Sequence, residues 1–230
     1  MLIYLDAGHG GRDSGAIGNG IKEKDIVLDI VKRIQSGLDQ YENVSTLLSR
    51  DTDIFLSLDE RTSKANAAKA DVFVSVHINS ATSTTARGFE SYIYPNAGAA
   101  TVAFQNVMHQ EIIRQINGVA GFDDRGKKQA NFAVLRQSAM KAVLTENMFI
   151  SNAADAALLK SDDFLDRIAQ GHVNGLEKYL GLKRIERPPE QKPSGKLYIV
   201  QVGAFEEKKN AEALAADLRK SGYRPFIKYE

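Results

Sequence analysis

Apolar residues along the first 180 positions recur with two different spacings, and these spacings predict strands and helices in turn. Short β-prone apolar runs are typical of buried strands, whereas apolar residues three and four positions apart are typical of amphipathic helices. Strands are expected at 2–6, 44–48, 71–78, 88–94, 132–135 and 142–146. Helices are expected at 24–38, 58–70, 99–116, 155–160 and 163–180. This alternation favours an α/β fold with a largely parallel sheet.

The pattern changes after residue 181. Residues 182–193 (LKRIERPPEQKP) hold three of the chain's five prolines among charged residues without apolar periodicity, which is typical of a semi-rigid linker. Beyond it, strands are expected at 197–205 and 223–229, on either side of a helix at 207–221. We therefore expect one domain at 1–181, a linker at 182–193, and a small β-α-β unit at 194–230.

Composition and charge then exclude several classes of function. With 30 basic and 29 acidic residues, the net charge of +1 gives no general attraction to nucleic acid or anionic membranes. The absence of cysteine excludes disulfides, thiolate zinc sites and cysteine nucleophiles. No apolar run approaches the roughly 18 residues of a membrane span, and no secretory signal precedes the first strand. We therefore expect synthesis in the cytoplasm, with an extracellular target reached after release or lysis.

Two of the four histidines stand at the ends of predicted strands, where side chains of an α/β sheet converge on one crevice. These are His9 and His77; Glu146 ends another apolar run, and Glu23 precedes the first helix. Two imidazoles and a carboxylate that leave a position open for water form a typical catalytic zinc set, and a second carboxylate can act as general base. No compact motif such as H-E-x-x-H is present, so spacing alone does not establish a metal site.

Each of these residues also has a structural interpretation. His9 could cap a loop, Glu23 could favour the positive end of a helix dipole, His77 could be a satisfied histidine at a strand end, and Glu146 could be a surface carboxylate. Taken singly, Glu23 and Glu146 are better explained in this way. Their joint placement with the two histidines favours a shared site.

The other two histidines and the known sequence motifs give no support for a second catalytic site or for nucleotide binding. His109 lies beside Gln110 and Glu111 in a predicted helix, so we expect a solvated side chain, whereas His172 is in phase with apolar helix positions and should be packed. The nucleophile elbow G-x-S-x-G and the phosphate-binding motif G-x-x-x-x-G-K-[ST] are both absent. Asp13 stands where a dinucleotide-binding loop needs its third glycine, so phosphate binding is not expected.

Several separate segments resemble, in order and at fitting separations, the N-acetylmuramoyl-L-alanine amidase 3 family over about residues 1–181. They are LDAGHGGRDSGAIG, KEKDIVLDI, LLSRDTD with ERTSKAN, VSVHINS and VLTENMFISN. One departure is Ala7, where many members carry proline. The resemblance implies a twisted sheet flanked by helices on both faces. It also implies that His9, Glu23 and His77 ligate Zn²⁺ and that Glu146 is the catalytic carboxylate.

Four further residues lie within the matched segments. Arg50, Arg61 and Asn66 are expected to give structural support. Asn79 is close to His77 in sequence and is a candidate for substrate contact or for support of the metal ligands.

The C-terminal segment resembles the sporulation-related repeat, a small α/β module associated with glycan binding. It covers about half of that module, which normally contains two β-α-β units. Half a module leaves a sheet edge open. We therefore expect a unit that is loosely ordered or that self-associates with a second tail.

The resemblance predicts a zinc-dependent hydrolase that cuts the amide bond between N-acetylmuramic acid and L-alanine in peptidoglycan. In this mechanism Glu146 takes a proton from the attacking water and then passes it to the departing amine. Two alternatives remain: a zinc peptidase or carboxypeptidase on the same stem peptide, and a catalytically inactive cell-wall binding protein. The tail favours a role in sporulation over lysis of a phage host.

Overall fold

The computed structural model describes residues 1–118, 122–186, 201–220, 223 and 225–228, and the chain divides into two compact units, Met1–Ile185 and Glu186–Glu230. The larger unit contains the sheet, and the smaller one contains a single described helix. None of the described helices is long and apolar enough to cross a membrane.

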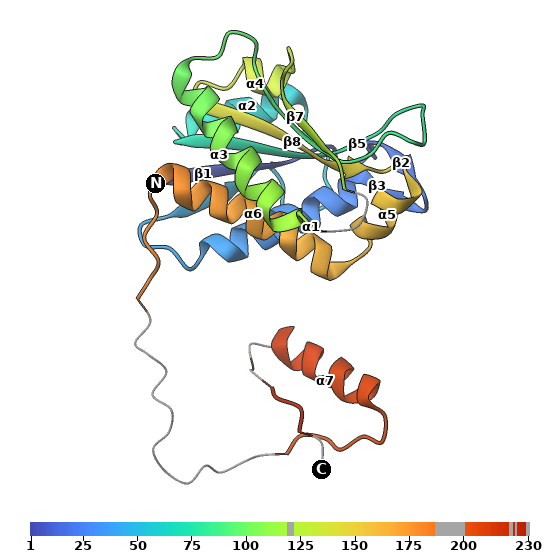
Figure 1. Ribbon diagram of the computed structural model, residues 1–230. Coiled ribbons are helices and arrows are strands. Elements are labelled where there is room, and N and C mark those ends of the chain that lie inside the picture. The colour runs from blue at the N-terminus through green and yellow to red at the C-terminus, as the bar shows by residue number, and fades with distance from the viewer. Residues whose placement is uncertain (119–121, 187–200, 221–222, 224, 229–230) are drawn as a thin grey trace. The chain divides into compact units, whose positions relative to one another are not determined.

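A six-stranded sheet forms the centre of the larger unit (Figure 1). Its strands lie in the order β4 (Ser45–Leu48), β1 (Leu2–Ala7), β5 (Val72–Asn79), β8 (Lys141–Phe149), β6 (Phe89–Ile93) and β7 (Asp124–Gln129). The first four run parallel, β6 runs antiparallel to β8, and β7 runs parallel to β6. The expected α/β fold with a mostly parallel sheet is confirmed.

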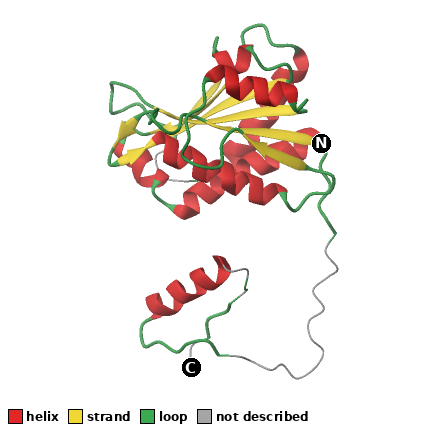
Figure 2. Cartoon of the chain, turned by 180° about the vertical axis from the view of Figure 1, so that it is seen from behind, coloured by secondary structure: helices red, strands yellow, loops and turns green. Residues whose placement is uncertain are grey.

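Side chains that alternate along the buried strands give the sheet two apolar faces. One face packs against α1 (Glu23–Leu38), α3 (Ala99–Ile116) and α6 (Asp162–Leu180). The other packs against α2 (Leu58–Ala67) and the short α4 (Ala133–Arg136). Figure 2 shows helices on both sides of the sheet, as expected.

Two smaller elements lie beyond the strands that carry the candidate site residues. The hairpin of β2 (Ile17–Gly18) and β3 (Ile21–Lys22) leads into α1, and α5 (Ala153–Leu159) follows β8. Asn19 at the turn of the hairpin donates from Nδ2 to the carbonyl of Ile150 at 2.8 Å. This contact ties the loop after β1 to the segment after β8.

The strand expected at 132–135 is wrong, because these residues begin the short helix α4. Phe132 is extended, and its carbonyl accepts from the amides of Leu135 and Arg136 at 3.1 and 2.9 Å. Val134 and Leu135 then pack into the apolar cluster on the α2 side of the sheet. A run of four apolar residues fits a strand or one buried helical turn equally well.

Strand β7 was not expected, because its sequence DRGKKQ carries no apolar signal. It lies at the edge of the sheet, where backbone pairing with β6 holds it.

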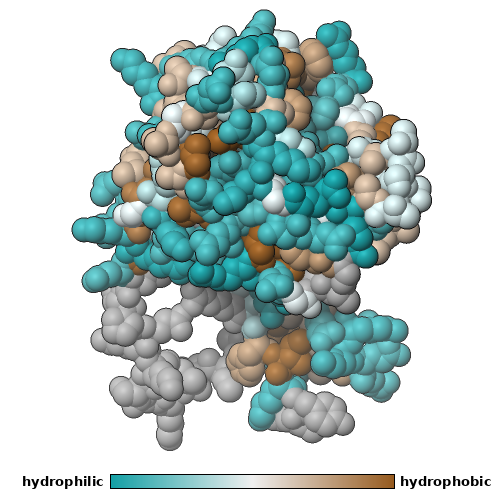
Figure 3. Space-filling model, turned by 45° about the horizontal axis from the view of Figure 1, so that its top comes forward, coloured by the Kyte–Doolittle hydropathy of each residue, from teal (hydrophilic) through white to brown (hydrophobic). Residues whose placement is uncertain are grey.

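Figure 3 shows that the visible face of the larger unit is mostly hydrophilic, with apolar side chains scattered among polar ones. Scattered exposed apolar side chains are normal on protein surfaces.

In the smaller unit, the expected helix is present as α7 (Lys208–Lys220). Residues 201–205 and 225–228 adopt no strand, and residues 197–200, 224 and 229 of the two expected strands lie outside the described residues. A lone pair of strands is marginally stable, which accounts for the difference.

At the start of the expected linker, the Lys183 carbonyl accepts from the Glu42 amide at 2.8 Å, and residues 187–193 are not described.

Candidate metal centre and active site

Buried arginines hold the loop that carries His9 at the end of β1. Arg50 donates from Nη2 to the carbonyl of Gly8 at 2.9 Å. Arg61 donates to Asp6 Oδ1 at 2.8 Å and to the carbonyl of His9 at 2.6 Å. His9 itself adopts a left-handed backbone conformation with φ of 58°. The structural role expected for both arginines agrees with these contacts.

The three candidate ligands come together although they are far apart in sequence. Glu23 Oε1 lies 3.1 Å from His9 Nε2 and 3.0 Å from His77 Nδ1. One ligand atom from each residue lies within 4.8 Å of the others. Gly8 permits this approach, because a Cβ atom there would lie 2.4 Å from Cε1 of the His77 ring.

Neighbouring groups orient the donor atoms. His9 Nδ1 lies 2.9 Å from Asp13 Oδ2, and since an ionised carboxylate only accepts, the ring hydrogen stays on Nδ1 and leaves Nε2 as the donor atom for a metal. Glu23 accepts from the amides of Ala16 and Ile78 at 2.9 and 3.0 Å. Both the ring and the carboxylate are therefore fixed before any ion binds.

The electrostatics of the cluster suit a bound cation. Burial raises the pKa of Glu23, but hydrogen bonds to the two histidines outweigh burial and hold it well below its usual range. Burial lowers the pKa of His9, yet Glu23 and Asp13 together raise it to about 9. The pKa of His77 is also raised, because its partner Glu23 outweighs burial. A divalent ion can take the place of the protons that these groups share, and two imidazole nitrogens with one carboxylate oxygen fit Zn²⁺.

Glu146 stands next to this cluster on the neighbouring strand. It pairs with His77 in the register of β5 and β8, so the two side chains share one face of the sheet. Its Oε2 is buried and has no hydrogen-bond partner among the described residues. Burial raises the pKa of Glu146 to about 7, and His77 opposes the shift. A carboxyl group with this pKa can take up and release a proton near neutral pH.

Asn79 contacts a group that sequence reasoning missed. Its Nδ2 donates to Glu90 Oε1 at 2.6 Å, and the same oxygen accepts from Tyr92 Oη at 2.6 Å. Glu90 Oε2 accepts from Arg125 Nε at 2.8 Å and from Lys128 Nζ. Asn79 thus supports this network, and its role as a substrate contact stays a prediction. Glu90 lies within the strand expected at 88–94, but no motif marked it as a candidate.

The expectation of a solvated His109 is wrong. Only 5% of this residue is exposed, and its ring lies 2.9 Å from both Ser91 Oγ and Asp124 Oδ1. Ser91 is fully buried, so this chain of hydrogen bonds supports the structure and presents no nucleophile. His172 is fully buried, as expected, with its ring 3.0 Å from Thr145 Oγ1, and burial lowers its pKa to about 4.

Comparison with known proteins places the chain in a family. The family described as N-acetylmuramoyl-L-alanine amidase matches residues 3–178. The chain belongs to this family. A second match, to the SPOR domain, covers residues 194–230. The expected resemblance of both parts is confirmed.

Named relatives of this amidase-family chain come from sporulation and from phage. A sporulation-specific N-acetylmuramoyl-L-alanine amidase of Bacillus subtilis is 47% identical over 228 residues, which are 99% of this chain and 84% of the relative. The endolysin of Bacillus phage SPP1 is 52% identical over 185 residues, 80% of this chain and 67% of the relative. The solved catalytic domain of CwlV, an N-acetylmuramoyl-L-alanine amidase from Bacillus (Paenibacillus) polymyxa, has a TM-score of 0.74 at 39% identity, covering 79% of this chain and 99% of that domain.

Proposed function

We propose that this amidase-family chain is a zinc-dependent hydrolase that cuts the amide bond between N-acetylmuramic acid and the L-alanine of the peptidoglycan stem peptide. The observation that carries the proposal is the convergence of His9, Glu23 and His77 beside a buried carboxyl group with an unpartnered oxygen, Glu146. Family membership and the names of the relatives supply the substrate class.

His9, Glu23 and His77 hold the ion in this proposal, and Asp13 keeps the His9 ring in place. A bound zinc ion supplies Lewis-acid chemistry, which polarises the scissile carbonyl and acidifies a water molecule. Glu146 takes a proton from the attacking water and then gives it to the amine of L-alanine as the C–N bond breaks. The products are a lactyl carboxylate on the sugar and a stem peptide with a free amine.

The test combines metal analysis with product analysis of purified cell walls. We expect about one zinc per chain, and release of intact stem peptides that begin with a free L-alanine amine. Loss of a terminal D-alanine would instead indicate a peptidase. Binding to walls without any release of products would indicate an inactive wall-binding protein.

Three variants separate metal binding from proton transfer. His9→Ala and His77→Ala should lose zinc and activity together. Glu146→Gln keeps the shape of the side chain but cannot act as a base, so it should keep zinc while turnover falls by at least about a hundredfold. Full zinc content in either histidine variant would contradict the ligand assignment, and wild-type turnover of the glutamine variant would contradict the role of Glu146.

The C-terminal unit is proposed to attach the enzyme to the glycan of the wall, in line with its match to the SPOR domain. A tethered binding module raises the local concentration of the enzyme at its polymer without changing the active site. Pairing between two tails stays a prediction. It would appear as concentration-dependent dimers that disappear when residues 186–230 are removed.

A further inference from the structure

On the side of Glu146 away from the candidate metal ligands, the sheet continues to β6 and β7, and β7 carries two cationic side chains. Glu90 on β6 is the direct partner of Glu146 on β8, so their Cβ atoms are about 5 Å apart on one face of the sheet. Arg125 and Lys128 on β7 both reach Glu90 Oε2. We refer to Arg125 and Lys128 as the cationic rim.

The cationic rim is held in a fixed geometry and carries spare positive charge. Glu90 is 2% exposed, whereas the side chains of Arg125 and Lys128 are 34% and 36% exposed. The Arg125 guanidinium also lies 4.7 Å from the centre of the Phe149 ring. The one carboxylate that both cations contact cannot neutralise both of them. Donors that are both positioned and exposed are suited to bind an anionic group.

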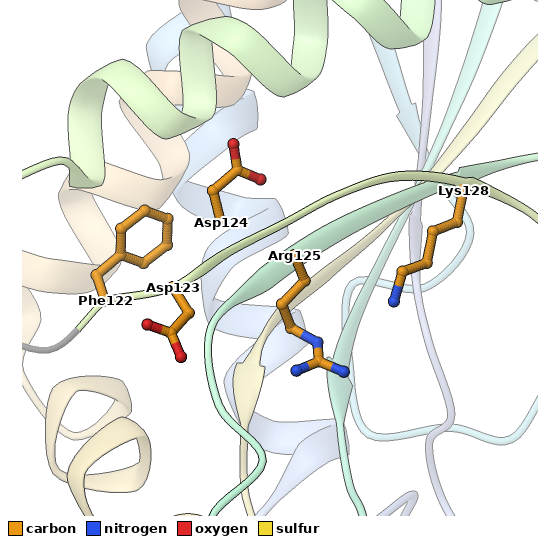
Figure 4. Close-up of a pocket in the computed structure, with 5 residues that line it drawn as sticks. All are labelled: Phe122, Asp123, Asp124, Arg125 and Lys128. Atoms are coloured by element: carbon orange, nitrogen blue, oxygen red, sulfur yellow. The ribbon is translucent and has the colours of Figure 1, made fainter.

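Both residues of the cationic rim line a cavity of about 560 Å³ together with Phe122, Asp123 and Asp124. Figure 4 shows Arg125 and Lys128 on the same side of β7, while Asp124 points to the other side. Asp124 is paired there with His109. Asp123 lies just before β7 and five residues before Lys128, so the cavity is positive toward Lys128 and negative toward Asp123.

We propose that the cationic rim binds the free α-carboxylate of the second stem-peptide residue, and the proposal rests on the function proposed above. Where that residue is a glutamate joined to the chain through its side chain, its α-carboxylate remains free and carries a negative charge at neutral pH. The carboxylate lies two residues beyond the scissile bond, which is about 7 Å in an extended chain. The rim lies one to two strand spacings from Glu146, or about 5 to 10 Å. The two distances are of similar size, and they can be compared because Glu146 acts at the scissile bond in the proposed function.

The rim therefore recognises the leaving peptide by its charge. The experiment uses two soluble N-acetylmuramoyl tripeptides that differ only at the second residue, which carries either a free α-carboxylate or an α-amide. The wild-type chain should prefer the acid by about tenfold in kcat/KM, the scale of one charge-assisted hydrogen bond, and mainly through KM. Lys128→Gln should reduce the preference to less than about twofold, because Glu90 keeps Arg125 as a partner. Arg125→Gln provides a second variant with the same expectation.

Lys127 offers a matched control on the same strand. It lies on the opposite side of β7, where its Nζ donates to Asn106 Oδ1 at 2.6 Å. Lys127→Gln removes the same charge and should leave the preference unchanged. Equal preferences in this control and in Lys128→Gln would overturn the proposal.

Binding to the Glu146→Gln variant, measured by calorimetry, gives the preference without catalysis. Tighter binding of the acid would support the rim even if the wild-type chain hydrolysed neither tripeptide, a result that would contradict only the proposed function. Equal binding of acid and amide, with normal hydrolysis of both by the wild-type chain, would overturn only the role of the rim.

Discussion

Replacement of Arg61 by methionine is expected to destabilise the larger unit and to weaken metal binding at the same time. Arg61 is 2% exposed and donates to Asp6 Oδ1 at 2.8 Å. It also donates to the carbonyl of His9 at 2.6 Å. Asp6 is fully buried, and besides Arg61 its carboxylate accepts from Ser75 Oγ at 2.7 Å. The substitution thus leaves a buried carboxylate without its countercharge and frees the carbonyl of a candidate metal ligand.

The size of the effect follows from the burial of this pair. Removing one partner of a buried ion pair costs about 3 to 5 kcal/mol. In a domain of this size, 1 kcal/mol shifts Tm by about 2 to 4 °C, so the variant should melt about 6 to 20 °C lower. The melting temperature is measured by circular dichroism, and zinc affinity by competition with a chelator.

The pH dependence gives a second test of the same reasoning. Burial alone raises the pKa of Asp6, but Arg61 outweighs it and holds the pKa below its usual range. Asp6 therefore stabilises the wild type above the unfolded pKa near 4, and this contribution is lost as the pH falls. Without Arg61 the pKa of Asp6 rises, so the variant loses stability as the pH increases. The difference in Tm between wild type and variant should shrink from pH 8 to pH 5.

A double variant separates the charge from the loop contact. Asp6→Asn combined with Arg61→Met removes the unpaired charge and should recover part of the lost stability. Zinc affinity should stay low, because the His9 carbonyl still lacks its donor. A change in Tm of less than about 2 °C for Arg61→Met, or no recovery in the double variant, would refute this account.

Three further predictions concern the metal loop and the tail. Asp13→Asn should weaken zinc binding by about 10- to 100-fold, whereas Asp53→Asn, which changes another exposed carboxylate near the loop, should not. Gly15→Ala should lose zinc and stability, because the new Cβ would lie 2.6 Å from Glu23 Oε2 and because the backbone at Gly15 has a left-handed φ of 62°. Gly20→Ala serves as the control: no atom lies within 4 Å of the new Cβ, so this variant should show only backbone strain. A chain that ends at Ile185 should cleave soluble muropeptides normally but sediment less with intact walls, and equal sedimentation would contradict the targeting role.

Much of the fold could be predicted because its buried strands and long helices carry strong apolar patterns. Strand β5 begins with the β-prone apolar run VFV and is buried at most of its positions, and α3 was found at its expected bounds, 99–116. The edge strand β7 could not be predicted, since backbone pairing with β6 holds a sequence without apolar residues. The prediction of a strand at residues 132–135 was wrong for the opposite reason, because their apolar side chains fit either a strand or a buried helical turn.

The candidate site was predictable to the extent that its residues lie at or near the ends of strands. His77 and Glu146 lie side by side in register, as residues near the ends of neighbouring parallel strands should. The proposed role of Glu23 as a ligand needed the family resemblance, because a carboxylate at a helix start is usual for other reasons. Glu90 and its cations could not be found from sequence, because their association depends on the pairing of β6 with both β7 and β8.

The reversed direction of β6 divides this amidase into two parts that can change separately. The candidate metal ligands and Glu146 lie on or next to α1 and the parallel strands β1, β5 and β8. The cationic rim and Glu90 belong instead to one continuous stretch of chain, residues 88–130, which contains β6, α3 and β7. In the role proposed for the cationic rim, exchange of that stretch between relatives, with the buried side of α3 retained, would change the peptide preference and leave the candidate metal ligands and Glu146 in place.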